Sequence, residues 1–168
     1  MFSIKSLTAL AIILVCACAP VAASTTFAEG LGDATGPIVA AGIAATYFGS
    51  GDHAKANAAR VADAAVIAFG ATELLKPSLK ANNDACYRHS FPSGHMAIAF
   101  GTATALADLH PKRKWLFYAG AALIGWSRVE SEAHTWRDVM GGAALGFGVG
   151  RMSMTSRDGL LIGRVYKF

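Results

Sequence analysis

The sequence has few charged residues: they make up 15% of its 168 residues, whereas soluble domains average about 25%. Its hydrophobic share is 54% and its mean hydropathy is +0.40. Much of this apolar content is Ala and Gly rather than Leu and Ile, which favours helices whose backbones pack closely. β-branched residues are too sparse for a sheet. Length and composition therefore predict one all-α domain.

Cysteine is also scarce, and it occurs only at Cys16, Cys18 and Cys86. The first two lie near the N-terminus in a segment that reads as a secretion signal, so Cys86 would be left alone and no intramolecular disulfide is expected. No C-x-x-C spacing suggests a metal site. The sequence has 15 basic and 11 acidic residues, which gives a net charge of only +4. No basic stretch is interleaved with aromatic residues. The sequence thus argues against nucleic acid, and no obligate protein partner is evident.

The N-terminus has the three parts of a signal peptide. Lys5 supplies the positive charge, residues 7–17 are apolar, and small residues precede Ser24. This predicts a cleaved signal over residues 1–23 and a single domain over residues 24–168. An uncleaved membrane helix or a lipoprotein anchored at Cys18 are the alternatives. All three place the protein in the cell envelope.

Turn signals divide the remaining chain into helical segments. We expect residues 24–35 to form a loop, and the pair Lys76-Pro77 to end the second helix. No structure is predicted for the tail, residues 153–168. The five expected helices cover residues 37–48, 54–75, 93–109, 112–128 and 134–152.

Short connections make consecutive helices antiparallel, so the predicted fold is a compact antiparallel bundle of about five helices. The end of the second helix, the start of the third, the end of the fourth and the start of the fifth then meet at one end of the bundle. Polar residues gather at this end, and simple basic residues, including 112–114 and Arg151, gather at the other. In a membrane, the basic end would face the cytoplasm.

Embedding in a bilayer is one of two possibilities for this bundle. Residues 142, 146 and 150 are glycines, a spacing that supports close helix packing in lipid. However, a span needs about 20 apolar residues, and residues 115–126 and 139–149 are shorter. The alternative is a soluble bundle that touches the membrane. Trp115, Trp126 and Trp136 would form an interfacial belt or fill the core.

The start of the third helix has the properties of an anion site. A helix start presents free backbone N–H groups and the positive end of the helix dipole, which suits a phosphate. Pro92, Ser93 and Gly94 lie at this start, and Gly94 would let an anion approach the backbone closely. The alternative is that Ser93 is an ordinary N-cap.

A histidine and an aspartate lie four residues apart at the start of the fifth helix, and we expect them to share a helix face. The Asp138 carboxylate would hold one nitrogen of His134 and leave the other as a nucleophile. The alternative is a surface pair of little energetic value. Arg128 lies nearby in the sequence, and its guanidinium could bind phosphate oxygens.

Together these residues resemble the type 2 phosphatidic acid phosphatase and vanadium-dependent haloperoxidase superfamily. Residues 92–95 match its Pro-Ser-Gly-His motif in full. Residues 127–138 match its Ser-Arg, five residues, His, three residues, Asp motif in full. The resemblance covers roughly residues 72–150.

The family's first motif, Lys, six residues, Arg-Pro, is imperfect in this sequence. Lys76 is well placed for its lysine, but Asn83 and Asp84 then occupy the Arg-Pro positions. Counting from Lys80 instead puts Arg88 one place late. One phosphate-binding arginine is therefore missing or displaced, and Arg88 or Lys80 is the candidate to replace it.

The resemblance implies a role for each residue. His134 would attack phosphorus, Asp138 would orient it, and His95 would protonate the leaving alcohol and then activate water. The phosphate oxygens would be held by Lys76, Ser93, Gly94 and Arg128. No metal and no cofactor are implied, because fixed cations and backbone dipoles would supply the electrostatic stabilisation.

The function implied by the resemblance is hydrolysis of a lipid phosphate monoester or pyrophosphate through a phosphohistidine, at the outer face of the cell membrane. The main alternative is a soluble periplasmic acid phosphatase that acts on water-soluble esters. A vanadate-dependent haloperoxidase and a non-catalytic bundle with an anion pocket are further alternatives.

Overall fold

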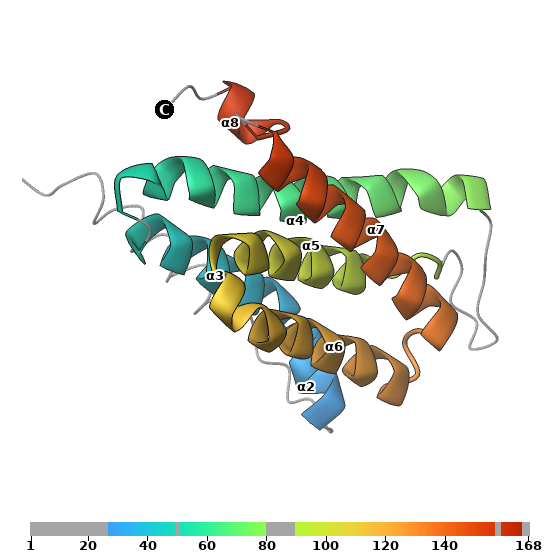
Figure 1. The fold of residues 1–168 in the computed structure, drawn as a ribbon. Helices are drawn as coiled ribbons and strands as arrows, with labels where there is room; N and C mark the ends of the chain where they lie inside the picture. Colours follow the sequence, from blue (N-terminus) through green and yellow to red (C-terminus); the bar gives the residue numbers. More distant parts are fainter. Residues whose placement is uncertain (1–26, 50, 80–89, 157–158, 166–168) are drawn as a thin grey trace, which may run out of the picture.

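The computed structural model describes residues 27–49, 51–79, 90–156 and 159–165, and these residues contain no β-strand. They form the all-α bundle that the sequence predicts (Figure 1). The elements are α2 (Phe27–Asp33), α3 (Thr35–Gly49), the 3₁₀ turn η1 (Gly51–His53), α4 (Ala54–Leu79), α5 (Gly94–Leu109), the 3₁₀ turn η2 (Pro111–Arg113), α6 (Lys114–Glu130), α7 (Trp136–Thr155) and α8 (Ile162–Val165).

The five long helices α3 to α7 correspond to the five predicted ones, but the expected N-terminal loop and the expected end of α4 are wrong. The expected loop over residues 24–35 contains the helix α2, since residues 27–33 are helical. The expected stop at Lys76-Pro77 is also wrong, because α4 continues to Leu79. Pro77 lies only two residues from the end of α4, where a missing backbone hydrogen bond disturbs little of the helix.

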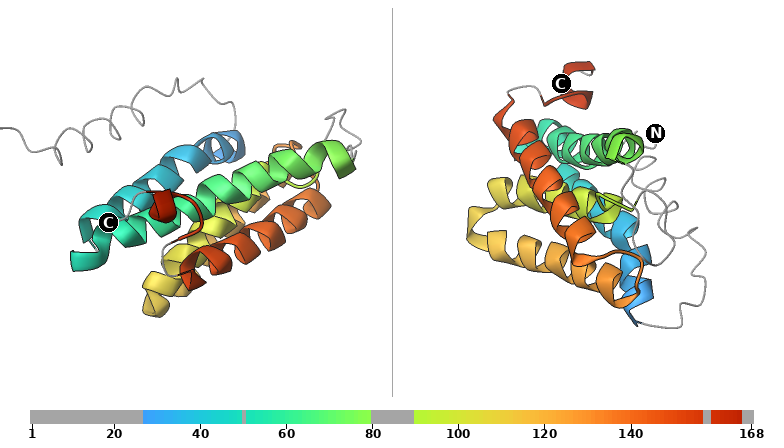
Figure 2. Two further views of the ribbon diagram at one scale, coloured as in Figure 1. Left: turned by 90° about the horizontal axis from the view of Figure 1, so that it is seen from above. Right: turned by 90° about the vertical axis from the view of Figure 1, so that its right-hand side faces the viewer.

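Helix α5 is the centre of the bundle and contacts α3, α4, α6 and α7. The views in Figures 1 and 2 show it between α4 on one side and α6 on the other, with α7 alongside. Ten of its sixteen residues are buried, and they are mostly Ala, Thr and Gly. Small side chains allow neighbouring helix backbones to approach closely, so α5 can be enclosed by four helices.

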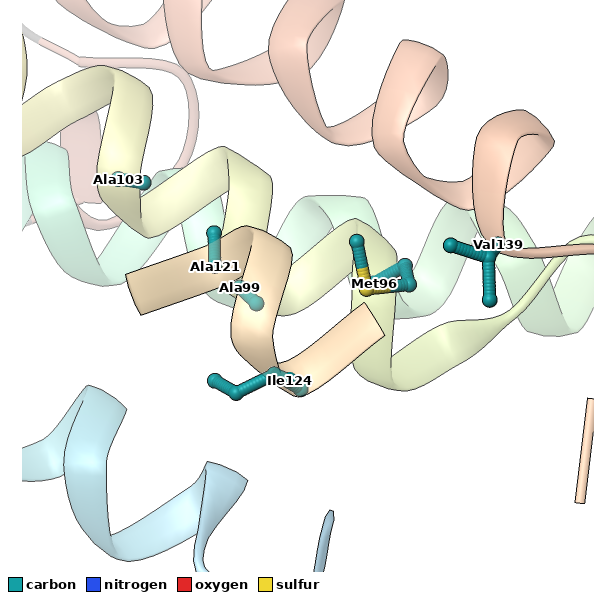
Figure 3. Close-up of a cluster of buried hydrophobic side chains, with 6 residues drawn as sticks. All are labelled: Met96, Ala99, Ala103, Ala121, Ile124 and Val139. Carbon is teal, nitrogen blue, oxygen red and sulfur yellow. The ribbon is translucent and has the colours of Figure 1, made fainter. Parts of the chain in front are cut away.

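Most of the core is made of small side chains, as the composition suggested. Its largest cluster joins α5, α6 and α7 around Met96, which is 1% exposed (Figure 3). Met96 fills the space that glycine leaves on α6, because a Cβ at Gly125 would lie 2.9 Å from the methionine sulfur. The cluster comprises Met96, Ala99, Ala103, Ala121, Ile124 and Val139.

The glycines spaced by four on α7 pack against the backbone of α5. A Cβ at Gly142 would collide with the carbonyl oxygen of Ser93, and a Cβ at Gly146 would collide with that of Ala97. At Gly150 it would lie 2.7 Å from the carbonyl oxygen of Gly101. These glycines therefore set the distance between α5 and α7, which carry His95 and Asp138.

A buried carboxylate holds the segment after α7 against α4. Asp63 is 0% exposed and accepts hydrogen bonds from the backbone N–H groups of Leu160, Leu161 and Ile162 at 2.8 to 3.1 Å. These groups lie at the start of α8, where a helix leaves its N–H groups without internal partners. The buried carboxylate oxygens of Asp63 thus have hydrogen-bond donors inside the bundle.

The three tryptophans lie on the surface, so the suggestion that they fill the core is wrong. Trp115, Trp126 and Trp136 are 73%, 38% and 57% exposed. None of the described helices combines the length and apolar character needed to cross a membrane.

Candidate active site

The predicted site residues that the structure describes gather at the right-hand end of the bundle in Figure 1. Lys76 is in the last turn of α4, His95 in the first turn of α5 and Arg128 in the last turn of α6. The rings of His95 and His134 have centroids 6.5 Å apart. The charges of Lys76 and Arg128 act on both histidines.

His134 lies just before α7 rather than on it, which corrects one sequence expectation. The helix begins at Trp136, and Thr135 is its N-cap. The His134 backbone N–H donates a hydrogen bond to the carbonyl of Arg128 at 3.0 Å, which closes the connection between α6 and α7. The histidine thus owes its position to this short connection and not to a shared helix face.

The aspartate nevertheless faces the histidine. The distance from His134 Nδ1 to Asp138 Oδ2 is 3.7 Å, which is longer than a hydrogen bond. Asp138 Oδ2 accepts a hydrogen bond from the backbone N–H of Thr135 at 3.0 Å, as part of a capping box. Asp138 therefore acts on the histidine through its charge, while the capping box fixes its own position. With Nδ1 directed to this carboxylate, Nε2 is the nitrogen left for an incoming group.

The environment favours the neutral form of His134. Burial, followed by the positive charge of Arg128, lowers its pKa below the ordinary 6.5, and the Asp138 carboxylate opposes the shift. A neutral imidazole has a lone pair and can act as a nucleophile, whereas an imidazolium cannot.

The pKa of His95 is lowered further than that of His134. Burial lowers its pKa to about 4, helped by the charges of Arg128 and Lys76. The Asp33 carboxylate at the end of α2 opposes this shift. No pattern in the sequence indicated Asp33, because it lies in the segment that was expected to be a loop.

Ser93 is not an ordinary N-cap. Its side chain is fully buried and makes no cap hydrogen bond to α5. Its Oγ has no hydrogen-bond partner among the described residues, and neither has the buried Oγ of Ser90 three residues earlier. A buried hydroxyl without a partner costs free energy, and an oxygen-bearing ligand at the start of α5 would supply one. This arrangement favours the anion site over the simple cap.

Arg128 is packed against a glycine that sequence reasoning missed. A Cβ at Gly32 would collide with the Arg128 guanidinium and lie 3.0 Å from its Cδ. Gly32 is buried in α2, so this short helix forms one wall beside the guanidinium. A Gly-containing segment before the first long helix reads as a loop, and nothing local shows that it packs on a residue of α6.

The remaining candidates for the site are Lys76, Gly94, Lys80 and Arg88. Lys76 Nζ pairs with Glu73 in the same helix at 2.5 Å. Gly94 packs on α4, with a Cβ position 3.5 Å from Thr72 Oγ1. Lys80 and Arg88, the candidates for the missing arginine, lie outside the described residues, and their role stays a prediction. Within the described ranges, no group of His, Cys, Asp and Glu side chains is placed to hold a metal ion.

An all-helical bundle that places two neutral histidines next to an arginine, a lysine and a helix N-terminus has the features of a phosphate-binding hydrolase. The comparison with known families agrees with this class. The model of the PAP2 superfamily matches residues 38–160, and the chain belongs to this superfamily. Its membership supports phosphatase activity. No curated protein and no solved structure matches the chain.

Proposed function

We propose that the protein hydrolyses a lipid phosphate monoester or pyrophosphate through a phosphohistidine on His134. The observation that carries this proposal is the pairing of His95 and His134, with ring centroids 6.5 Å apart, under the charges of Arg128 and Lys76. Reacting atoms approach to about 3–3.5 Å before bonds change. A phosphoryl group between the rings can therefore contact both.

In the first step, the neutral Nε2 of His134 attacks phosphorus and forms a P–N bond. The P–O bond to the leaving alcohol breaks, and the His95 imidazolium gives its proton to the departing oxygen. A bound phosphate dianion brings negative charge beside His95 and raises its pKa. The substrate thus supplies the charge that lets His95 hold a proton.

In the second step, the now neutral His95 accepts a proton from water as the water oxygen attacks phosphorus. The P–N bond breaks, inorganic phosphate leaves, and His134 is neutral again. Arg128, Lys76 and the start of α5 stabilise the charge on the equatorial oxygens in both steps. Over the two steps, one ester and one water molecule are converted to one alcohol and one phosphate.

The test is phosphate release from a panel containing phosphatidic acid, a polyprenyl pyrophosphate and a water-soluble aryl phosphate. His134→Gln should abolish release, while His53→Gln, an exposed histidine at the other end of the bundle, should leave it unchanged. An alkaline quench should trap an acid-labile phosphoprotein in the unmodified enzyme and in His53→Gln, but not in His134→Gln. Release from the aryl phosphate alone would favour the soluble acid phosphatase, and full activity of His134→Gln would refute the nucleophile.

In the proposed mechanism, side chains and backbone dipoles stabilise the charge on the phosphate oxygens, and no metal is required. We therefore expect a chelator to leave phosphate release unchanged. Vanadate should inhibit competitively, because it adopts the five-coordinate geometry of the transferring group. Loss of activity in the chelator that a divalent ion restores would contradict the metal-independent mechanism.

We further propose that the protein is associated with the cell membrane, with its site on the periplasmic or outer side. The signal-like residues 1–23 support export, and the exposed apolar side chains of α6 and α7 support contact with lipid. These are Trp115, Leu116, Leu123, Trp126, Trp136, Met140, Phe147 and Met152.

The location can be tested with an impermeant thiol reagent on intact cells. Glu130→Cys, exposed at the site end of α6, and Lys114→Cys, exposed at its other end, are each made in a chain without native cysteines. Labelling at position 130 alone supports an embedded bundle with the site outside. Labelling at both positions supports a bundle wholly outside the membrane. Protection at 130 until the cells are opened would refute an outward-facing site.

A further inference from the structure

An apolar cavity of about 280 Å³ lies between α2, α3, α5 and α6. Its lining includes Leu31, Val39, Ala103, Leu106, Phe117 and Ile124. Among the residues that the structure describes, no charged residue lines it and the one polar side chain is that of Thr102. The cavity therefore offers almost nothing to a polar ligand and suits a hydrocarbon.

One end of this cavity adjoins the candidate active site. Ala99 lines the cavity one helical turn after His95, and Ile124 lines it one turn before Arg128. Four residues of helix rise about 6 Å. Leu31, from α2, is next to Gly32, which packs on Arg128. Figure 3 shows Ala99 and Ile124 on the neighbouring helices α5 and α6.

The cavity extends away from the site along α6. From Ile124 to Leu116 the helix spans eight residues, or about 12 Å. The far part is open to solvent at Leu116, which is 70% exposed. Leu123 and Ile38, elsewhere in the lining, are 56% and 46% exposed. A chain lying in the cavity would thus have one end near the cations and the other near the surface.

We propose that this cavity binds the hydrocarbon tail of the substrate whose phosphate is held beside Arg128 and His95. The inference rests on the proposed phosphatase function and assigns a place to the tail. The apolar lining, the adjoining cationic end and the length of about 12 Å along α6 match a molecule with a phosphate at one end and a hydrocarbon at the other. Burial of each methylene that fits strengthens binding about fourfold.

The test fills the cavity with a side chain. Gly120 lines the cavity, and a Cβ there would meet nothing within 4 Å, so Gly120→Leu places a leucine in open space. The matched control is Gly148→Leu on α7, which is outside the cavity lining and has the same open space around its Cβ position. Both changes replace Gly by Leu inside a helix, so their effects on helix propensity are equal.

The measurement is kcat/KM for a long-chain phosphate monoester divided by kcat/KM for a short water-soluble one. We expect Gly120→Leu to lower this ratio by about tenfold or more, since several methylenes lose their place. Gly148→Leu should leave the ratio unchanged. An unchanged ratio in Gly120→Leu, or an equal fall in both variants, overturns the assignment.

A binding measurement separates this inference from the proposed function. Dodecylphosphonate and methylphosphonate share a head group that is not hydrolysed, and calorimetry gives their affinities for the unmodified protein and for Gly120→Leu. The tail site is supported if the unmodified protein binds the dodecyl compound more tightly than the methyl compound and Gly120→Leu removes this difference. This result would support the tail site even if no phosphate ester is hydrolysed. Equal binding of the two compounds overturns it, and is the result expected if another part of the chain or a partner protein occupies the cavity.

Discussion

The backbone N–H of Ser93 donates a hydrogen bond to the backbone carbonyl of Asp138 at 3.0 Å. This bond joins the residue before α5 to the first turn of α7, and both residues are buried. Because main-chain atoms make the bond, the register between the two segments does not depend on the histidine side chains. Replacing those side chains should therefore change the chemistry and leave the site assembled.

The first prediction concerns the role of His95 as an acid. His95→Gln should slow hydrolysis of an alkyl phosphate by about 10²–10⁴-fold, the usual range for general acid–base catalysis. Release of the alcohol from an aryl phosphate with a good leaving group needs no proton, so that step should slow much less. Single-turnover rates for the two esters give the comparison. Equal losses for both esters would contradict the acid role.

The second prediction concerns the titration of His95. Because burial and neighbouring cations lower its pKa to about 4, its ring resonance in NMR should titrate near pH 4 in the ligand-free protein. Added inorganic phosphate should move the midpoint upward, since an anion favours the imidazolium. A ligand-free midpoint at the ordinary value of about 6.5 would show that the ring is neither buried nor close to the cations.

The same shift has a consequence for stability. An unfolded chain binds a proton at His95 below about pH 6.5, whereas the folded chain does so only near pH 4. Unfolding therefore takes up a proton in this window, and the contribution of His95 to the free energy of unfolding decreases as pH falls from about 6.5 to about 4. His95→Gln should weaken this dependence in denaturant titrations. An unaltered slope would contradict the shifted pKa.

The third prediction concerns the glycine beside Arg128. Gly32→Ala should push the guanidinium away, because the added Cβ would collide with it, and the loss of a charged hydrogen bond lowers phosphate affinity by about tenfold or more. Gly36→Ala, where a Cβ meets nothing within 4 Å, is the control. Vanadate inhibition constants for both variants provide the measurement. Equal constants would show that α2 does not position Arg128.

The fourth prediction concerns the packing of α7 on α5. Gly146→Ala would force a methyl group into the carbonyl oxygen of Ala97, and overpacking of this kind costs about 1–3 kcal/mol. Gly148→Ala, two residues along the same helix, has open space and should gain up to about 1 kcal/mol from helix propensity. Chemical denaturation should thus shift in opposite directions. Shifts of the same sign would contradict the close contact.

The sequence predicted the parts of the fold and site that depend on local pattern. Turn signals separated α3 to α7, and their alternation brought His95, Arg128 and His134 to one end. The contact between His134 and Asp138 was anticipated, although His134 precedes the helix. Complete motifs carry this information because their spacing is short and fixed.

Features that depend on distant contacts could not be predicted. α2 resembles a loop because it contains Gly30 and Gly32, yet Gly32 is needed for the approach of Arg128 from α6. The Asp33 carboxylate acts on His95, which lies far away in the sequence. A local pattern cannot reveal which residue a small side chain makes room for.

The hydrogen bonds of Asp63 have a consequence for biosynthesis. Their donors, Leu160 to Ile162, follow Asp63 by 97 to 99 residues. Ribosomes add about 5–20 residues per second, so α4 exists for roughly 5–20 seconds before these donors are made. During that interval a packed α4 would enclose a carboxylate without these three hydrogen bonds, which is costly. Nascent chains should therefore leave this part of α4 open to water and to chaperones until residues 160–162 have emerged.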